Sequence, residues 1–256
     1  MSNLFIFVVF LVNCGYLSTG QDYSDYCSWS LCSGLPHVGC GNGGQFGPQC
    51  PAGVREFDLA PYQNEILHRY NYYRNAVAGG YVPGYSRAVR MATMVWDDEL
   101  EYLAYLNAIR CDFNHDDCRN TNRFRNSGQN IAWRWDPANE APSAGDAVLW
   151  AIDYWFSEYT LADMSVINSF YWGTGSEHFT VMVAERNVAT GCAVLQYRDG
   201  GGMTTYVVCN YATTNIIDRP IYRSGRTTSQ CREGGNPQYP NLCEVTEQYS
   251  VNSNRW

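Results

Sequence analysis

The cysteines constrain this chain more than any other feature of its sequence. There are eleven, and Cys14 follows an apolar stretch, LFIFVVFLV (residues 4–12), that precedes Ser18-Thr19-Gly20. The stretch is too short to span a bilayer and is typical of a signal peptide, with a buried N-terminal strand as the alternative. We expect residues 1–20 to be removed and the protein to be secreted. The ten remaining cysteines are an even number, as expected of a disulfide-bonded extracellular chain.

Composition excludes several kinds of chemistry and partner. All seventeen basic residues are arginine, so a lysine nucleophile, a Schiff base and a P-loop lysine are absent. The formal charge of −8 makes nucleic acid an unsuitable partner, because binding to phosphates needs a basic surface. After the leader, no stretch reaches the length of a transmembrane helix, so we expect no integral membrane association.

The chain divides by composition into three parts. Four cysteines lie in the Gly- and Pro-rich stretch CSWSLCSGLPHVGCGNGGQFGPQCP (residues 27–51), which predicts a disulfide-held loop region over residues 21–60. The main domain is expected over residues 61–217. Residues 218–256 are polar, contain a short loop between Cys231 and Cys243, and are interpreted as a C-terminal extension.

The main domain is predicted to have helices first and strands afterwards. One helix should end at Gly79-Gly80, a second should begin at Asp97 as its N-cap, and a third should begin at Ser143. Strands are predicted over residues 181–184, 193–197 and 205–211, and pairing of the last two would place Cys192 opposite Cys209. This order predicts an α+β fold around an antiparallel sheet.

The stretch CDFNHDDC (residues 111–118) places His115 among three carboxylates and between two cysteines. The cysteines are too far apart for usual zinc ligands, so disulfide bonding is the better interpretation. His115 alone is most simply a hydrogen-bonded turn residue. His178, just before a predicted strand, and Glu158, among aromatic residues, strengthen the functional alternative. Two imidazoles and a carboxylate suffice for a divalent-metal site or an acid/base pair.

Several motifs resemble those of the CAP superfamily, the cysteine-rich secretory, antigen 5 and pathogenesis-related proteins. SEHFTVMVAERNVATGC resembles the signature GHFTQMVW…GC, and CDFNHDDC, SGQNIAW, WFSEY and NYYR resemble CxFxHDxC, GENxA, WYxE and HNxxR. The match is strongest to insect antigen 5 proteins, dipteran members in particular. The resemblance implies a three-layer α-β-α sandwich with a central cleft. It implies that His115 and His178 are ligands of Zn²⁺ or another divalent ion. Glu158 and position 129 would support these ligands or reach the ion through a water molecule.

This sequence departs from the family pattern at four positions. Gln129 replaces an acidic residue, which predicts a weak or vestigial cation site and removes half of any two-carboxylate mechanism. Glu177 replaces a glycine and is a candidate cleft residue beside His178. Ala184 replaces a tryptophan, and Tyr70 replaces a histidine. The matched residues Asn71 and Arg74 are expected to be structural ties.

The resemblance also implies disulfide pairings that the sequence alone leaves open. The implied pairs are Cys27–Cys40, Cys32–Cys118, Cys50–Cys111 and Cys192–Cys209, with Cys231–Cys243 left as a local loop.

Three classes of function follow from the resemblance. The first, which we favour, is a non-enzymatic, monomeric binding protein for a small hydrophobic ligand such as a lipid, sterol or eicosanoid, or for a host factor, as in saliva. The second is a protein antagonist acting through another surface; the loop GNGGQFGPQ has no Arg-Gly-Asp, which disfavours integrin binding of that type. The third is a metal-dependent hydrolase, for which Ser176 is the nearest serine to the His178 motif.

Overall fold

The computed structural model describes residues 23–253. The expected signal peptide and Cys14 lie outside the described residues. Within them, no helix combines the length and apolar character needed to cross a membrane.

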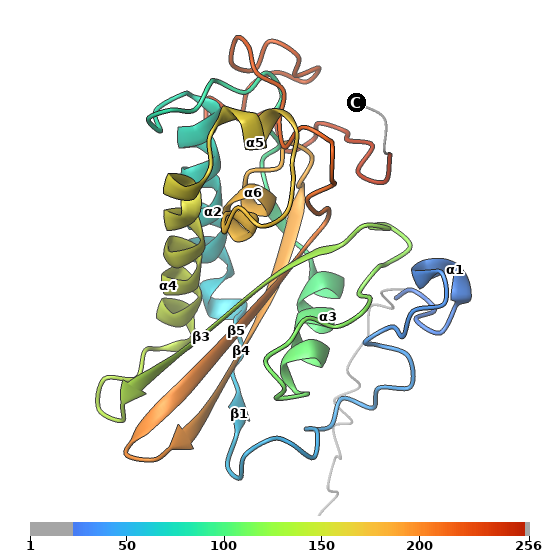
Figure 1. Cartoon of the computed structure of the whole chain (residues 1–256), viewed down its shortest axis with the longest axis vertical. Coiled ribbons are helices and arrows are strands. Elements are labelled where there is room, and N and C mark those ends of the chain that lie inside the picture. Colours follow the sequence, from blue (N-terminus) through green and yellow to red (C-terminus); the bar gives the residue numbers. More distant parts are fainter. Residues whose placement is uncertain (1–22, 254–256) are drawn as a thin grey trace, which may run out of the picture.

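A mainly antiparallel sheet forms the middle of the molecule. Its strand order is β1 (Arg55–Glu56), β4 (Ala189–Asp199), β5 (Gly202–Tyr211) and β3 (Gly128–Pro137), and β2 (Val95–Trp96) pairs in parallel with β4. The three long strands project beyond the helices at one end (Figure 1). Strand β3 is at an edge of the sheet.

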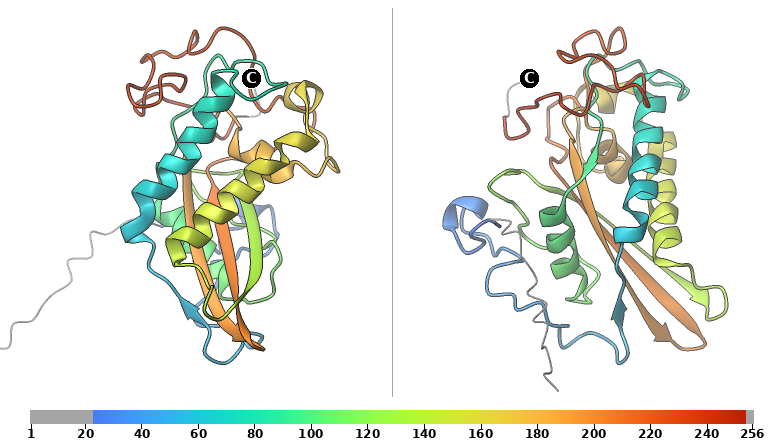
Figure 2. Two further views of the ribbon diagram at one scale, coloured as in Figure 1. Left: turned by 90° about the vertical axis from the view of Figure 1, so that its left-hand side faces the viewer. Right: turned by 180° about the vertical axis from the view of Figure 1, so that it is seen from behind.

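Helices cover both faces of the sheet. Helices α2 (Gln63–Ala78) and α4 (Ala144–Ser157) lie side by side on one face, and α3 (Asp98–Ala108) lies on the other (Figures 1 and 2). The largest apolar core lies between the sheet and α2 and α4, and a second core lies between the sheet and α3. The α+β fold and the three-layer α-β-α arrangement predicted from the sequence are therefore confirmed.

The three predicted helices begin and end close to the expected residues. The Asp97 side chain accepts the Leu100 N–H, and the Ser143 side chain accepts the Asp146 N–H, so both predicted N-caps are present. Shorter helical segments complete the chain: α1 (Trp29–Cys32), η1 (Ala60–Tyr62), η2 (Glu158–Leu161), α5 (Met164–Asn168) and α6 (Glu177–Met182).

The strand predicted over residues 181–184 is wrong, and His178 therefore does not precede a strand. His178 lies in helix α6, and Val183 and Ala184 follow that helix without joining the sheet. The run is buried on all sides, so its apolar character cannot distinguish a strand from a buried helix. Strand β3, which the sequence analysis did not assign, takes the edge position instead.

The predicted hairpin of β4 and β5 is confirmed in its register, because Cys192 lies opposite Cys209. The structure contains the five disulfides that the family resemblance implies, Cys27–Cys40, Cys32–Cys118, Cys50–Cys111, Cys192–Cys209 and Cys231–Cys243. The second and third connect the N-terminal loops to the segment that follows α3.

Asn71 and Arg74 tie α2 to the rest of the core. The Asn71 amide exchanges hydrogen bonds with the backbone of Met94. The Arg74 guanidinium is fully buried and donates to the carbonyls of Ala92, Met182 and Ala184. Burial lowers the pKa of Arg74 to about 10. Both residues are structural ties, as expected.

Candidate functional site

Glu158 and His178 form one half of the candidate site. Glu158 ends α4 and begins η2, and its Oε1 lies 2.6 Å from His178 Nδ1. Its Oε2 accepts the backbone N–H groups of His178 (3.0 Å) and Phe179 (3.2 Å). The Trp155 ring stacks at 6.0 Å from the imidazole. One carboxylate therefore holds both the ring and the start of α6.

His115 and Gln129 form the other half. His115 Nδ1 lies 2.7 Å from Gln129 Oε1, and Gln129 Nε2 donates to Asp116 Oδ2 and Asn210 Oδ1, each at 2.9 Å. Burial is the main cause that lowers the pKa of His115, although one side of the residue remains exposed to solvent. The imidazole is therefore neutral at neutral pH.

These partners fix the tautomer of both histidines. The Gln129 amide nitrogen already donates to two acceptors, so the Gln129 amide oxygen must face His115. Because that oxygen can only accept, Nδ1 of His115 must carry the proton. The Glu158 carboxylate requires the same of His178. Neither Nε2 atom has a hydrogen-bond partner among residues 23–253. In the neutral form of each ring, Nε2 carries the lone pair through which histidine binds metals.

The two halves meet at the edge strand β3. Successive side chains of a strand point to opposite faces, and Gln129 and Asn130 are successive. Gln129 holds His115 on the α3 face, whereas Asn130 Nδ2 donates to the His178 carbonyl (3.1 Å) on the other face. The electrostatic influence of His178 is the last of the causes that act on the pKa of His115, and it lowers that pKa.

Comparison with known proteins identifies the family. The model of the cysteine-rich secretory protein family, CAP, matches residues 67–211, more than half of the chain. The chain belongs to the CAP family. Venom allergen-1 of Aedes aegypti is 38% identical over 240 residues, 92% of this chain and 93% of that protein. The antigen 5 like allergen Cul n 1 of Culicoides nubeculosus is 34% identical over 187 residues, 68% of this chain and 84% of that protein.

Solved structures share the CAP fold. NaASP2 with Zn²⁺ superposes with a TM-score of 0.60 at 25% identity, over 76% of this chain and 100% of that chain. BmVAL-1 gives a TM-score of 0.61 at 24% identity, over 76% and 98%. The resemblance to dipteran antigen 5-like CAP proteins is thus confirmed.

Two residues near the CAP signature do not join the histidines. The Glu177 carboxylate turns back and accepts the N–H groups of Gly173 (2.7 Å) and Thr174 (3.1 Å), so it stabilises the preceding loop. Ser176 is fully buried, and its hydroxyl lies 2.6 Å from that of Thr174. That hydroxyl is not exposed for attack on a substrate.

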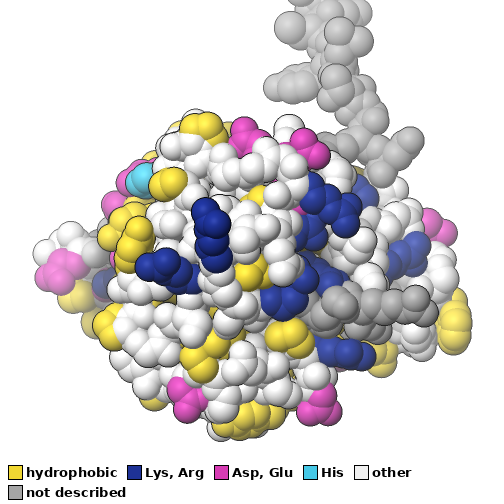
Figure 3. Space-filling view, turned by 90° about the horizontal axis from the view of Figure 1, so that it is seen from above, with side chains coloured by type: hydrophobic (Ala, Val, Ile, Leu, Met, Phe, Trp, Pro, Cys, Tyr) yellow, Lys and Arg dark blue, Asp and Glu magenta, His cyan; other side chains and the backbone are white. Residues whose placement is uncertain are grey.

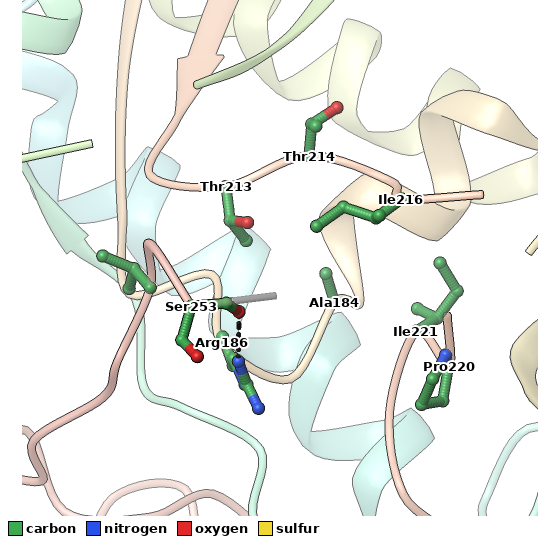
Figure 4. A pocket seen from close by; sticks show the side chains of 9 residues that line it. Ala184, Arg186, Thr213, Thr214, Ile216, Pro220, Ile221 and Ser253 are labelled. Carbon is green, nitrogen blue, oxygen red and sulfur yellow. Dashed lines mark hydrogen bonds between the residues drawn. The ribbon is translucent and has the colours of Figure 1, made fainter. Parts of the chain in front are cut away.

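A small pocket lies beside Ala184, where the CAP signature has tryptophan. Its walls include Ile216 and Ile221, and the Arg186 guanidinium donates to the Ser253 carbonyl at its rim (Figure 4). The cavity volume is about 10 Å³, which leaves room for about one water molecule.

A second group of metal-ligand residue types lies outside the histidine pair. This group consists of Cys32, His37 and Cys118, whose possible ligand atoms all lie within 4.8 Å of one another. It is the only such group of three His, Cys, Asp or Glu side chains in the described part of this CAP protein. The two cysteines are bonded to each other. His37 Nε2 lies 2.7 Å from the Asn120 carbonyl, and its Nδ1 accepts the Gly39 N–H. All three side chains are thus already used, which argues for a structural role.

Sequence reasoning missed three residues that position the candidate ligands. They are Asp116 and Asn210, which orient the Gln129 amide, and Asn130, which holds the His178 backbone. Asn210 faces Gln129 in the ladder of β3 and β5. Assigning β3 as a strand would have revealed this pair.

Proposed function

We propose that this CAP protein is a secreted, non-enzymatic binding protein that holds a divalent cation, such as Zn²⁺, weakly at Nε2 of His115 and His178. The observation that carries the proposal is that Nδ1 of each ring is bound to an oxygen, while Nε2 of each ring has no hydrogen-bond partner in the part of the chain that the structure describes. The Zn²⁺ in NaASP2, a relative of the same fold, supports it. No third ligand atom completes a compact cluster within residues 23–253, so water would fill the other positions and the ion would exchange readily.

Several features support a binding role over hydrolysis. Gln129 is a neutral amide with both ends engaged, and Glu158 already accepts bonds from the ring and two backbone groups. Ser176 is buried. A bound cation would instead supply a Lewis-acidic contact for an oxygen of a partner molecule. The family description and the five disulfides support secretion.

Native mass spectrometry of the secreted protein tests this proposal directly. We expect one Zn²⁺ per chain at micromolar free metal, lost on brief treatment with a chelator while the protein mass and fold are unchanged. The same spectra report any co-purified lipid, sterol or eicosanoid, and such a mass would support the small hydrophobic ligand as partner. Absence of bound metal at saturating Zn²⁺ would overturn the cation site.

A host protein is the second candidate partner, and exposed aromatic side chains favour it. Trp133 and Trp135 point to the same face of the edge strand β3 and are 60% and 48% exposed. Tryptophan is enriched at the centres of protein interfaces.

Removal of both rings should weaken capture of host proteins. We expect immobilised wild-type protein to enrich specific plasma proteins and the double variant Trp133→Ala, Trp135→Ala to lose that enrichment about tenfold or more. Trp172→Ala is the matched control, since Trp172 is 61% exposed but lies outside the sheet. Quantitative mass spectrometry provides the measurement. Equal enrichment by the double variant would refute a role for this surface.

A further inference from the structure

A groove separate from the histidine pair lies where the N-terminal segment meets α3. Its walls are β1 with the residues that follow it, the first two turns of α3 and the segment at Tyr23, and β4 forms its base. Its volume is about 430 Å³, within the range of small-molecule sites. We call it the acidic groove.

The charge on its walls is of one sign. Among the described residues, four carboxylates and no arginine line the groove. None of the ion pairs between described residues includes any of the four. Burial is the main cause that raises the pKa of Glu101. The hydrogen bond from Trp96 lowers this pKa, and the charges of Asp98 and Asp58 raise it further. The four are Glu56, Asp58, Asp98 and Glu101.

Aromatic rings complete the lining. Tyr23 and Tyr102 stack with ring centroids 5.3 Å apart and planes inclined by 7°, and Tyr105 lies 6.5 Å from Tyr102. The faces of such rings attract cations, especially where carboxylates lower the potential further. The lining thus combines a negative field with flat apolar surfaces.

The spacing of the carboxylates favours a protonated amine over a metal ion as the bound cation. No three of these groups bring their oxygens within 4.8 Å of one another, because the only such cluster among residues 23–253 is the one at Cys32. A metal ion such as Ca²⁺ needs oxygens that converge on one point. A protonated amine needs one or two carboxylates and an aromatic surface for its body.

We propose that the acidic groove binds a small organic cation, a protonated amine with an aromatic or other flat apolar body. No arginine between residues 23 and 253 lines the groove, although the Arg55 guanidinium lies 6.0 Å from the ring centroid of Phe57, which does. Many arginines gather on the face that is seen from above (Figure 3). Arg87, Arg219 and Arg226 are among the exposed arginines. The excess of negative charge among the described lining residues favours a ligand of positive charge.

Isothermal titration with two probes of similar shape and opposite charge tests whether the groove selects a positively charged ligand. Tryptamine is expected to bind, whereas indole-3-acetate, which has a similar ring and a negative charge, is expected not to bind up to about 1 mM. Raising NaCl from about 0.05 to about 0.5 M should weaken tryptamine binding. Equal binding of the two probes, binding of Ca²⁺ in place of tryptamine, or no binding of tryptamine at about 1 mM would overturn the proposal.

Neutral isosteres test the location. The double variant Asp98→Asn, Glu101→Gln should bind tryptamine about tenfold more weakly, because each exposed charge pair contributes modestly. The amide oxygen of Gln can still accept the Trp96 Nε1–H bond that Glu101 now accepts at 2.8 Å. Glu140→Gln removes an exposed carboxylate outside the groove and should leave binding unchanged. Unchanged affinity in the double variant would place the ligand elsewhere; should that variant fail to fold, the probe comparison still decides.

Discussion

His178→Ala should abolish specific Zn²⁺ binding, with a loss of affinity of about 100-fold or more. The variant removes one of two nitrogen ligands, a larger change than loss of an outer hydrogen-bond partner, which typically costs 10- to 100-fold. His115→Ala should have a similar effect, because neither ring alone can hold the ion against water. The measurement is isothermal titration or competition with a fluorescent zinc chelator at pH 7.5, where imidazole is largely neutral.

The chain provides a histidine control for this experiment. His68 lies on α2, and its Nδ1 is 2.8 Å from the Tyr239 hydroxyl, outside the candidate site. His68→Ala should leave the zinc affinity unchanged. If His178→Ala bound zinc as well as the native protein, or if His68→Ala lost binding equally, the ion would be held elsewhere.

Arg74→Ala should reduce the free energy of unfolding by about 3 to 5 kcal/mol. The substitution leaves three buried carbonyls without their donor and opens a cavity in a closely packed core. Relief of the desolvation that lowers the pKa of Arg74 offsets only part of that loss. Urea denaturation with the disulfides intact measures the change.

Arg69→Ala separates the effect of burial from the loss of an arginine on the same helix. Arg69 forms an ion pair with Asp153, and the side chains of the pair are 33% and 43% exposed. Because such pairs contribute little, we expect a cost of about 1 kcal/mol or less. A comparable loss in both variants would show that the buried ties of Arg74 are not what stabilises α2.

Local patterns in the sequence predict those elements whose determinants are also local. The helices at Asp97 and Ser143 were predictable because a capping side chain and an apolar stripe lie within one turn of each other. The hairpin of β4 and β5 was predictable because its strands are joined by a short glycine-rich turn. The disulfide pairs were implied by family resemblance, since spacing cannot choose among so many pairings.

The remaining features depend on contacts between distant segments. The run at residues 181–184 has no local signal to show that its carbonyls meet Arg74, so a strand was the natural expectation. From the sequence, Gln129 was interpreted only as the loss of the negative charge that the family pattern has at this position. In the structure its amide donates to Asp116, a bond that a carboxylate at this position could not make without repulsion. The acidic groove also joins residues from four separate segments.

The disulfides Cys32–Cys118 and Cys50–Cys111 have a consequence for where the protein can work. They begin at the two cysteines that flank His115, so the ligand loop is held in place by bonds that form only under oxidising conditions. If the chain is exported as proposed, the loop that carries His115 would be fixed during export, and in a reducing cytosol it would lack these two bonds. Formation of these two disulfides would thus restrict the proposed cation binding to oxidising compartments.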